Sequence, residues 1–194
     1  ASYFFLSASS IIFFFLFFST ILTLYSAPVE TRFSFGGLVL GAKESAYHRS
    51  SEQFRKELRI RTHVDPKDKN SWVWLNEKTI KNSPPFIWIV IGSSAKITPE
   101  LVSALQRFLF SGGTAFVEAE SSHQAQGALN DLRNQVFYKK KISEVKKKTL
   151  LTRTYYIISD NDAKSLKTIQ YASRSLWIES NKPVLKRITP HYDA

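Results

Sequence analysis

A strand–helix–strand unit at residues 86–118 constrains the fold of this 194-residue chain more than any other feature. The apolar run 86–91 (FIWIVI) is typical of a strand that is covered on both faces, as in a parallel sheet. Thr98 and Pro99 form the start signal of a helix, and the glycine pair 112–113 forms its stop before a second apolar strand. A strand, a helix and a strand in this order predict a βαβ unit and an α/β fold.

The flanking sequence extends this unit into one α/β domain over residues 28–194, with a mostly parallel sheet and helices on both faces. That length is enough for one domain with a substantial core and too short for two ordinary domains. A brief helix is expected between Asn76 and Lys81. The other predicted helices are 44–58 and 122–137, and the other predicted strands are 33–40, 59–64, 114–117, 149–158 and 176–178.

The N-terminal segment predicts a membrane-directed leader at residues 1–27. The 23 residues 3–25 include no charged residue, proline or glycine. As a helix they would be about 34 Å long, against about 30 Å for a hydrocarbon core, so a transmembrane anchor fits. A cleaved signal peptide fits as well, because 11–24 has the length of a signal's apolar region and small residues follow it. We therefore expect a domain on the extracytoplasmic side of the cytoplasmic membrane, or one secreted to the periplasm.

Composition excludes several classes of site. The chain has no cysteine, which excludes a disulfide framework, a zinc ribbon and a thiol nucleophile. Lysine and arginine (27) exceed aspartate and glutamate (16), for a net charge of +11. Six lysines fall in one short run that contains a single glutamate: Lys139, Lys140, Lys141, Lys146, Lys147 and Lys148.

That lysine run has two interpretations. It is a solvated loop or a strand edge that lysines protect from aggregation, or it is a basic contact surface for an acidic protein or anionic lipid. Nucleic acid is not favoured, because few aromatic side chains for base stacking stand beside the run in the sequence.

Three groups of motifs carry a family resemblance. They are 107–118 (RFLFSGGTAFVE) after the strand 86–91, then 54–58 (FRKEL) with 64–66 (VDP), and 132–133 (LR) with 153–156 (RTYY). Taken in their order along the chain, these motifs resemble a bacterial domain family of unknown function. That family has a class I glutamine amidotransferase-like fold and usually follows a signal peptide or membrane helix. The resemblance covers roughly residues 33–160 and implies that fold. It does not imply amidotransferase activity, because those enzymes use a cysteine just after this strand.

The carboxyl ends of the predicted strands are the place where an open α/β sheet binds ligands. Here they are 41–43, 92–94 and 118–123, and the last reads EAESSH. Its candidate residues are Glu118, Glu120, Ser121, Ser122 and His123. A serine beside a histidine suggests a nucleophile and its base, and two glutamates with a histidine suggest metal ligands. Neither a G-x-S-x-G nor an H-E-x-x-H motif is present. The alternative is that Ser122 caps the next helix and the glutamates are solvated or paired.

We therefore assign no catalytic, cofactor-binding or metal residue from the sequence. We expect a non-enzymatic domain that acts through protein–protein contacts in a bacterial envelope assembly, with other envelope proteins or an anionic membrane surface as partners. The alternative is a hydrolase or metal-assisted enzyme that uses the edge 118–123.

Trp72 and Trp74 are either core or an exposed anchor for a partner. His48, His63 and His191 are expected to be surface or satisfied histidines.

Overall fold

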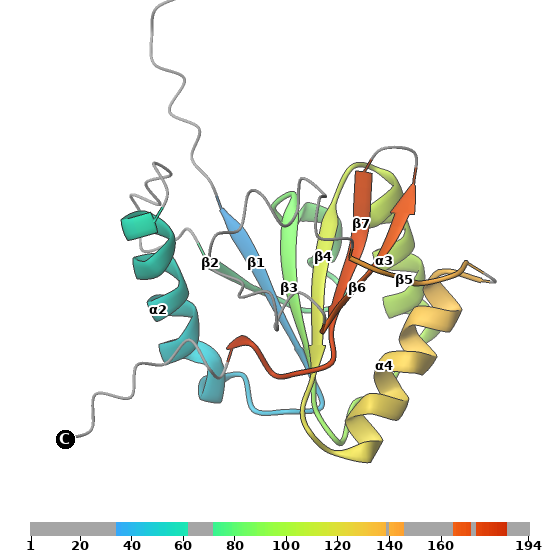
Figure 1. Cartoon of the computed structure of the whole chain (residues 1–194), viewed down its shortest axis with the longest axis horizontal. Coiled ribbons are helices and arrows are strands. Elements are labelled where there is room, and N and C mark those ends of the chain that lie inside the picture. Colours follow the sequence, from blue (N-terminus) through green and yellow to red (C-terminus); the bar gives the residue numbers. More distant parts are fainter. Residues whose placement is uncertain (1–33, 62–71, 139, 146–164, 172–173, 186–194) are drawn as a thin grey trace, which may run out of the picture. The chain divides into compact units, whose positions relative to one another are not determined.

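The computed structural model describes residues 34–61, 72–138, 140–145, 165–171 and 174–185, and it contains a seven-stranded sheet (Figure 1). The strand order is β2-β1-β3-β4-β7-β6-β5. The strands are Phe35–Leu40 (β1), Trp72–Leu75 (β2), Phe86–Ile91 (β3), Thr114–Ala119 (β4), Ser143–Glu144 (β5), Leu166–Tyr171 (β6) and Arg174–Ser180 (β7).

Most of this sheet is parallel. Strands β1, β2, β3, β4 and β7 run in the same direction. Strand β6 is antiparallel to β7, and β5 is antiparallel to β6. The predicted α/β class with a mostly parallel sheet is therefore confirmed, with an antiparallel edge that the sequence did not indicate.

Helices cover both faces of the sheet. They are Ser45–Arg61 (α2), Pro99–Phe110 (α3) and His123–Val136 (α4), with a short 3-10 helix at Ile80–Asn82 (η2). Buried side chains of α3 and α4 pack in one core, and those of α2 pack in the other. Figure 1 shows α2 and α4 on opposite sides of the sheet.

Strand β3 lies between the two cores, as its sequence predicts. Ile87 and Ile89 point into the core of α3 and α4, whereas Trp88 and Val90 point into the core of α2. Each of the four is at most 4% exposed, so both faces of the strand are buried. A continuous apolar run, rather than an alternating one, is the consequence of this double burial.

Local signals set the ends of α3 and α4. The Thr98 hydroxyl accepts a hydrogen bond from the Leu101 N–H at 3.1 Å, and the Ser122 hydroxyl accepts one from the Ala125 N–H at 3.1 Å. These bonds satisfy N–H groups that the first turn of a helix leaves without a partner. The Gly112 backbone has a φ of +119°, which suits glycine at the end of α3. The predicted caps of both helices are confirmed.

The strand predicted at 59–64 is wrong at its start. Residues 59–61 form the last turn of α2, and 62–64 lie outside the described residues. No glycine or proline lies between Leu58 and Arg61, so the helix continues, and a short alternation of polar and apolar residues does not end it. The brief helix expected after Asn76 is only the 3-10 turn η2.

Two other predicted segments lie outside the described residues, namely the leader 1–27 and the strand 149–158. In the ranges that the structure does describe, none of the helices has both the length and the apolar character needed to cross a bilayer.

An aromatic cluster fills the space between α2 and the sheet. Trp72 is 8% exposed, and its ring lies 6.0 Å from that of Phe54 on α2. The core interpretation of Trp72 is therefore confirmed, whereas Trp74 is only half-buried and lies 5.1 Å from the ring of His48. Gly37 of β1 leaves room for these indoles, because a Cβ there would lie 2.4 Å from the Trp72 ring nitrogen.

We predict that Gly37→Ala destabilises the domain. The added methyl group would overlap both indoles, and overpacking of this kind costs about 1–3 kcal/mol. Urea unfolding of the full chain measures the change in the free energy of unfolding.

Gly127→Ala is the matched control, because nothing lies within 4 Å of a Cβ at this position of α4. Alanine is the better helix former, so this variant is expected to be more stable by roughly 0.5–1 kcal/mol. Equal effects of the two substitutions would contradict the packing described for Gly37.

Candidate functional site

The loops after β1 and β3 are bonded to each other at the carboxyl edge of the sheet. The chain leaves β1 toward β2 on one side, whereas β3 lies on the other, so this is the point where strand order reverses. The Gly41 carbonyl accepts hydrogen bonds from the Ser94 N–H at 3.3 Å and the Ser94 hydroxyl at 2.8 Å. The Gly92 N–H donates to the Leu40 carbonyl at 2.7 Å. A Cβ on Gly92 would lie 2.3 Å from the Gly41 oxygen, so the two backbones meet directly.

Glu118 holds the segment that follows β7. Its side chain is 1% exposed and accepts hydrogen bonds from the N–H of Val184 at 2.7 Å and of Leu185 at 3.0 Å. A carboxylate that accepts two backbone N–H groups is well placed to stabilise a buried turn of chain. Glu118 therefore links β4 to residues 184–185.

Glu120 accepts a hydrogen bond from helix α2. The Tyr47 hydroxyl donates a hydrogen bond to the Glu120 carboxylate at 2.8 Å. Tyr47 is 1% exposed, and its burial, this hydrogen bond and the charges of Glu120 and Glu118 raise its pKa above the ordinary value of 10.0. The phenol therefore stays protonated and ties α2 to the end of β4.

The other candidates of the segment 118–123 point elsewhere. Ser121 is exposed, and Ser122 caps α4, as the alternative interpretation expected. His123 is exposed at the start of α4, and this helix covers the face opposite to α2. Within the described ranges, no three His, Asp or Glu side chains are close enough together to hold a metal ion.

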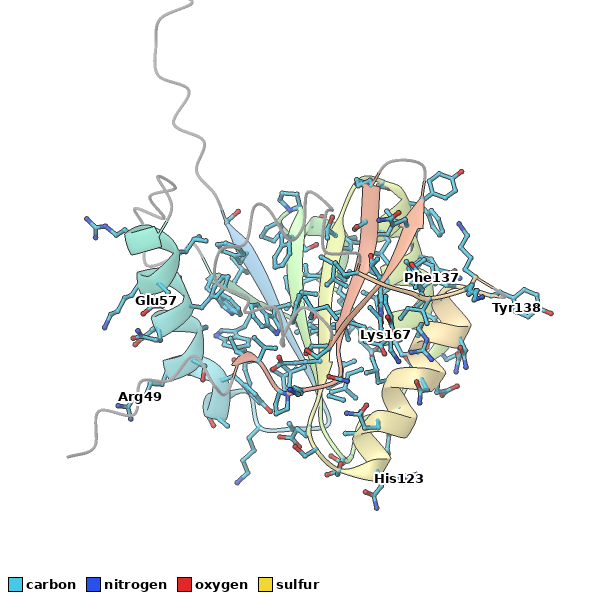
Figure 2. The ribbon with its side chains drawn as sticks, in the orientation of Figure 1. Arg49, Glu57, His123, Phe137, Tyr138 and Lys167 are labelled. Atoms are coloured by element: carbon cyan, nitrogen blue, oxygen red, sulfur yellow. The ribbon has the colours of Figure 1, made fainter. Side chains whose placement is uncertain are left out.

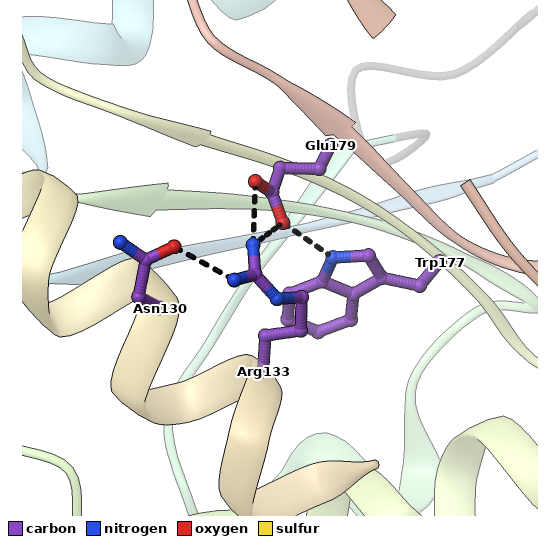
Figure 3. Close-up of polar contacts among 4 residues, drawn as sticks. All are labelled: Asn130, Arg133, Trp177 and Glu179. Atoms are coloured by element: carbon purple, nitrogen blue, oxygen red, sulfur yellow. Dashed lines mark hydrogen bonds and ion pairs between the residues drawn. The ribbon is translucent and has the colours of Figure 1, made fainter. Parts of the chain in front are cut away.

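A second polar cluster ties α4 to the sheet (Figure 3). Arg133 donates to both carboxylate oxygens of Glu179 at 2.9 Å, and the Trp177 indole N–H donates to the same carboxylate at 3.2 Å. Asn130 accepts a further bond from Arg133 at 2.8 Å. Glu179 is 6% exposed, so its charge is neutralised inside the protein by Arg133. This cluster is a structural link that the sequence analysis did not anticipate.

Exposed aromatic side chains gather at the opposite, amino edge of the sheet. Phe110 ends α3 and Tyr171 ends β6, and their ring centroids lie 5.9 Å apart. The Lys140 ammonium lies 4.4 Å from the Tyr171 ring centroid and 5.9 Å from that of Phe110. We call Phe110, Lys140 and Tyr171, together with the next residue Lys141, the amino-edge corner. Tyr138 is not part of it, because its side chain points outward, away from the sheet (Figure 2).

The amino-edge corner corrects one step of the sequence analysis. Few aromatic residues neighbour the lysine run in the sequence, but the fold brings Phe110 and Tyr171 to Lys140. Lys140 and Lys141 are exposed.

The other predicted lysines and two of the histidines lie outside the described residues, namely Lys139, Lys146, Lys147, Lys148, His63 and His191. His48 is at the surface, where it lies 3.1 Å from the Glu44 carboxylate.

The model of a domain of unknown function, DUF4159, matches residues 31–191 of the chain. The chain belongs to this family. The match spans every strand and helix of the described DUF4159 domain, including Glu118 of β4, Glu120 just after it and the amino-edge corner. No curated protein matches the chain.

We predict that Glu118→Gln destabilises this DUF4159 domain by about 1–3 kcal/mol, because an amide donor replaces one of the oxygens that face two backbone N–H groups. Urea unfolding measures the loss, and amide hydrogen exchange at Leu185 is expected to become faster. Glu52→Gln, an exposed position of α2, is the control and is expected to stay within about 0.5 kcal/mol. Unchanged exchange at Leu185 would contradict the link.

We predict that the buried Tyr47 phenol makes the free energy of unfolding depend on pH in the alkaline range. Its pKa is raised in the folded state, so its contribution is fully present below about pH 10 and is lost as pH rises toward the folded pKa. Tyr47→Phe is therefore expected to flatten the fall of unfolding free energy above about pH 10, where one proton accounts for up to about 1.4 kcal/mol per pH unit. Tyr138→Phe, at an exposed position, is the control for removal of one phenol. Parallel profiles for all three proteins would contradict the buried contact.

Proposed function

We propose that this DUF4159 domain is a non-enzymatic domain, membrane-associated or periplasmic, that acts through protein–protein contacts in a bacterial envelope assembly. The observation that carries the proposal is the carboxyl edge. The loops after β1 and β3 are bonded to each other, and Glu118 of β4 and Glu120 just after it bind groups of the same chain. The polar groups of this edge are therefore bonded within the domain and stabilise its fold. This supports a role in which the surface of the domain contacts other proteins.

The sequence of residues 3–25 supports the proposed location. An uncharged segment of this length directs a chain to a membrane, whether it is kept as an anchor or removed as a signal. The domain is accordingly proposed to lie on the extracytoplasmic side of the cytoplasmic membrane or in the periplasm.

The strand order supports the finer fold assignment that we propose, an amidotransferase-like or flavodoxin-like sheet. The parallel strands are neighbours in the order β2-β1-β3-β4-β7. If the parallel strands alone are counted, this is the 2-1-3-4-5 order of a doubly wound sheet. Because the chain has no cysteine, the assignment concerns the fold and not glutamine hydrolysis.

The alternative function, a hydrolase or metal-assisted enzyme at the edge 118–123, has weaker support. Glu120 turns toward α2, where it meets Tyr47, whereas His123 begins the helix on the other face. A general base must come within hydrogen-bond reach of its nucleophile, and this arrangement separates the candidate groups.

The test is purification of the tagged full chain from the membranes of its own cells after mild crosslinking, followed by identification of co-purifying proteins and of the mature N-terminus. We expect the same stoichiometric envelope proteins with the wild type and with the double variant Glu120→Gln, His123→Ala. The double variant leaves the Glu118 link intact, so the domain is expected to stay folded.

Two results would contradict the proposal. One is a mature protein that is soluble and purifies alone. The other is a double variant that keeps all its partners and its fold but loses the cellular role of the protein, because that result would assign the role to chemistry at the edge 118–123.

A further inference from the structure

We infer that the amino-edge corner (Phe110, Lys140, Lys141 and Tyr171) docks on the anionic headgroups of a lipid bilayer. The inference rests on the membrane association in the proposed function. It adds the contact surface, the class of lipid and the edge of the domain that faces the membrane.

The first support is the gathering of exposed rings. Of the large hydrophobic side chains in the described ranges, four are strongly exposed, and two of these, Phe110 (51%) and Tyr171 (56%), meet in the corner with ring centroids 5.9 Å apart. Grouped exposed apolar side chains on a soluble domain mark an interaction site. Tyrosine has an apolar ring with a polar tip, and it is enriched at the headgroup level of bilayers.

The second support is the charge around these rings. Lys140 stands over both Tyr171 and Phe110, and Lys141 is exposed beside it. Arg174 follows at the start of β7 and donates to the Leu109 carbonyl at 2.8 Å. The chain as a whole carries +11, so its long-range field attracts an anionic surface.

The third support is the direction of the strands. Strands β1, β4 and β7 are parallel, so all three begin at the same edge (Figure 1). The corner lies at this edge, because Phe110 precedes β4 and Tyr171 precedes β7. The chain enters β1 at Phe35, ten residues after Tyr25, the last residue of the segment 3–25. An extended connection of ten residues spans at most about 35 Å, so a membrane that holds the segment 3–25 is within reach of this edge.

A lipid surface fits these observations better than two other anionic partners. Single-stranded nucleic acid also binds to lysines and aromatic rings, but a domain exported across a membrane seldom meets it. An acidic protein would satisfy the lysines, but the placement of the corner at the edge where the leader joins is a specific reason for a membrane. Both partners are outcomes of the experiment below.

The experiment uses the absence of cysteine in the chain. Ser111→Cys and Ser121→Cys place one fluorophore each on exposed serines before and after β4, at the amino and carboxyl edges. The labelled full chain is reconstituted in nanodiscs of phosphatidylcholine alone, or with about 30% phosphatidylglycerol, that carry a headgroup nitroxide quencher. We expect at least about twofold quenching at position 111 in the anionic nanodiscs, little at position 121, and recovery at about 0.5 M salt.

Charge and ring variants identify the contact. Lys140→Glu with Lys141→Glu is expected to abolish the quenching at position 111, whereas Lys78→Glu with Lys81→Glu, the same change of charge at exposed positions between β2 and β3, is expected to preserve it. Phe110→Ala with Tyr171→Ala is expected to weaken it at least about twofold. Both lysine pairs are exposed, so their substitution is expected to leave the domain folded. The comparison of the two lysine variants therefore tests the inference even if the ring variant unfolds.

Several results would overturn the inference. Equal quenching at the two labels, or equal quenching without phosphatidylglycerol, would mean that the leader alone sets the distance to the membrane. A chain that enters the nanodiscs without quenching at position 111 would remove the lipid contact and leave the proposed function standing. Salt-sensitive binding of polyglutamate or oligo(dT) at the corner in that case would assign it to an acidic protein or to nucleic acid. A chain that does not enter nanodiscs would overturn the inference and would leave the periplasmic form of the proposed function standing.

Discussion

The burial of β3 on both faces is the constraint on which the rest of the domain depends. This strand pairs with β1 on one side and β4 on the other along its whole length. Its side chains belong alternately to the two cores, so neither layer of helices packs without it. The end of β3 also positions the carboxyl edge, because the Gly92 N–H donates to the carbonyl of Leu40, the last residue of β1, and the Ile91 carbonyl accepts the Glu120 N–H at 2.9 Å. One apolar run therefore organises both the sheet and the candidate site.

The elements with strong local signals were predictable from the sequence. Helix α3 has a cap, a proline, an apolar stripe and a glycine stop within one short segment, and strand β3 has an unbroken apolar run. Strand β6 had no such signal, because the pairing is irregular between Ile169 and Gln170 and this breaks the alternation of polar and apolar residues. The end of α2 was placed too early because the sequence near Arg59 fits a strand as well as a helix.

The residues of the carboxyl edge were predictable, but their partners were not. Strand ends meet at one edge of a parallel sheet, so Glu118 and Glu120 were expected there. Tyr47 is 73 residues from Glu120, and Leu185 is 67 residues from Glu118. Such pairs depend on strand order and on which face each side chain takes, and spacing in the sequence does not encode either. The meeting of Lys140 with Phe110 and Tyr171 was missed for the same reason.

The fixation of α4 has an entropic consequence. Arg133 binds this helix to β7, and Gln106 of α3 donates to the carbonyl of Val136 in its last turn at 3.2 Å. Phe137, directly after the helix, packs against Trp177 with ring centroids 5.6 Å apart. The last turn of α4 and Phe137 are thus held to both α3 and β7 by contacts within the domain. A partner that binds beside this turn meets a preorganised helix end, so little conformational freedom of the helix remains to be lost on association.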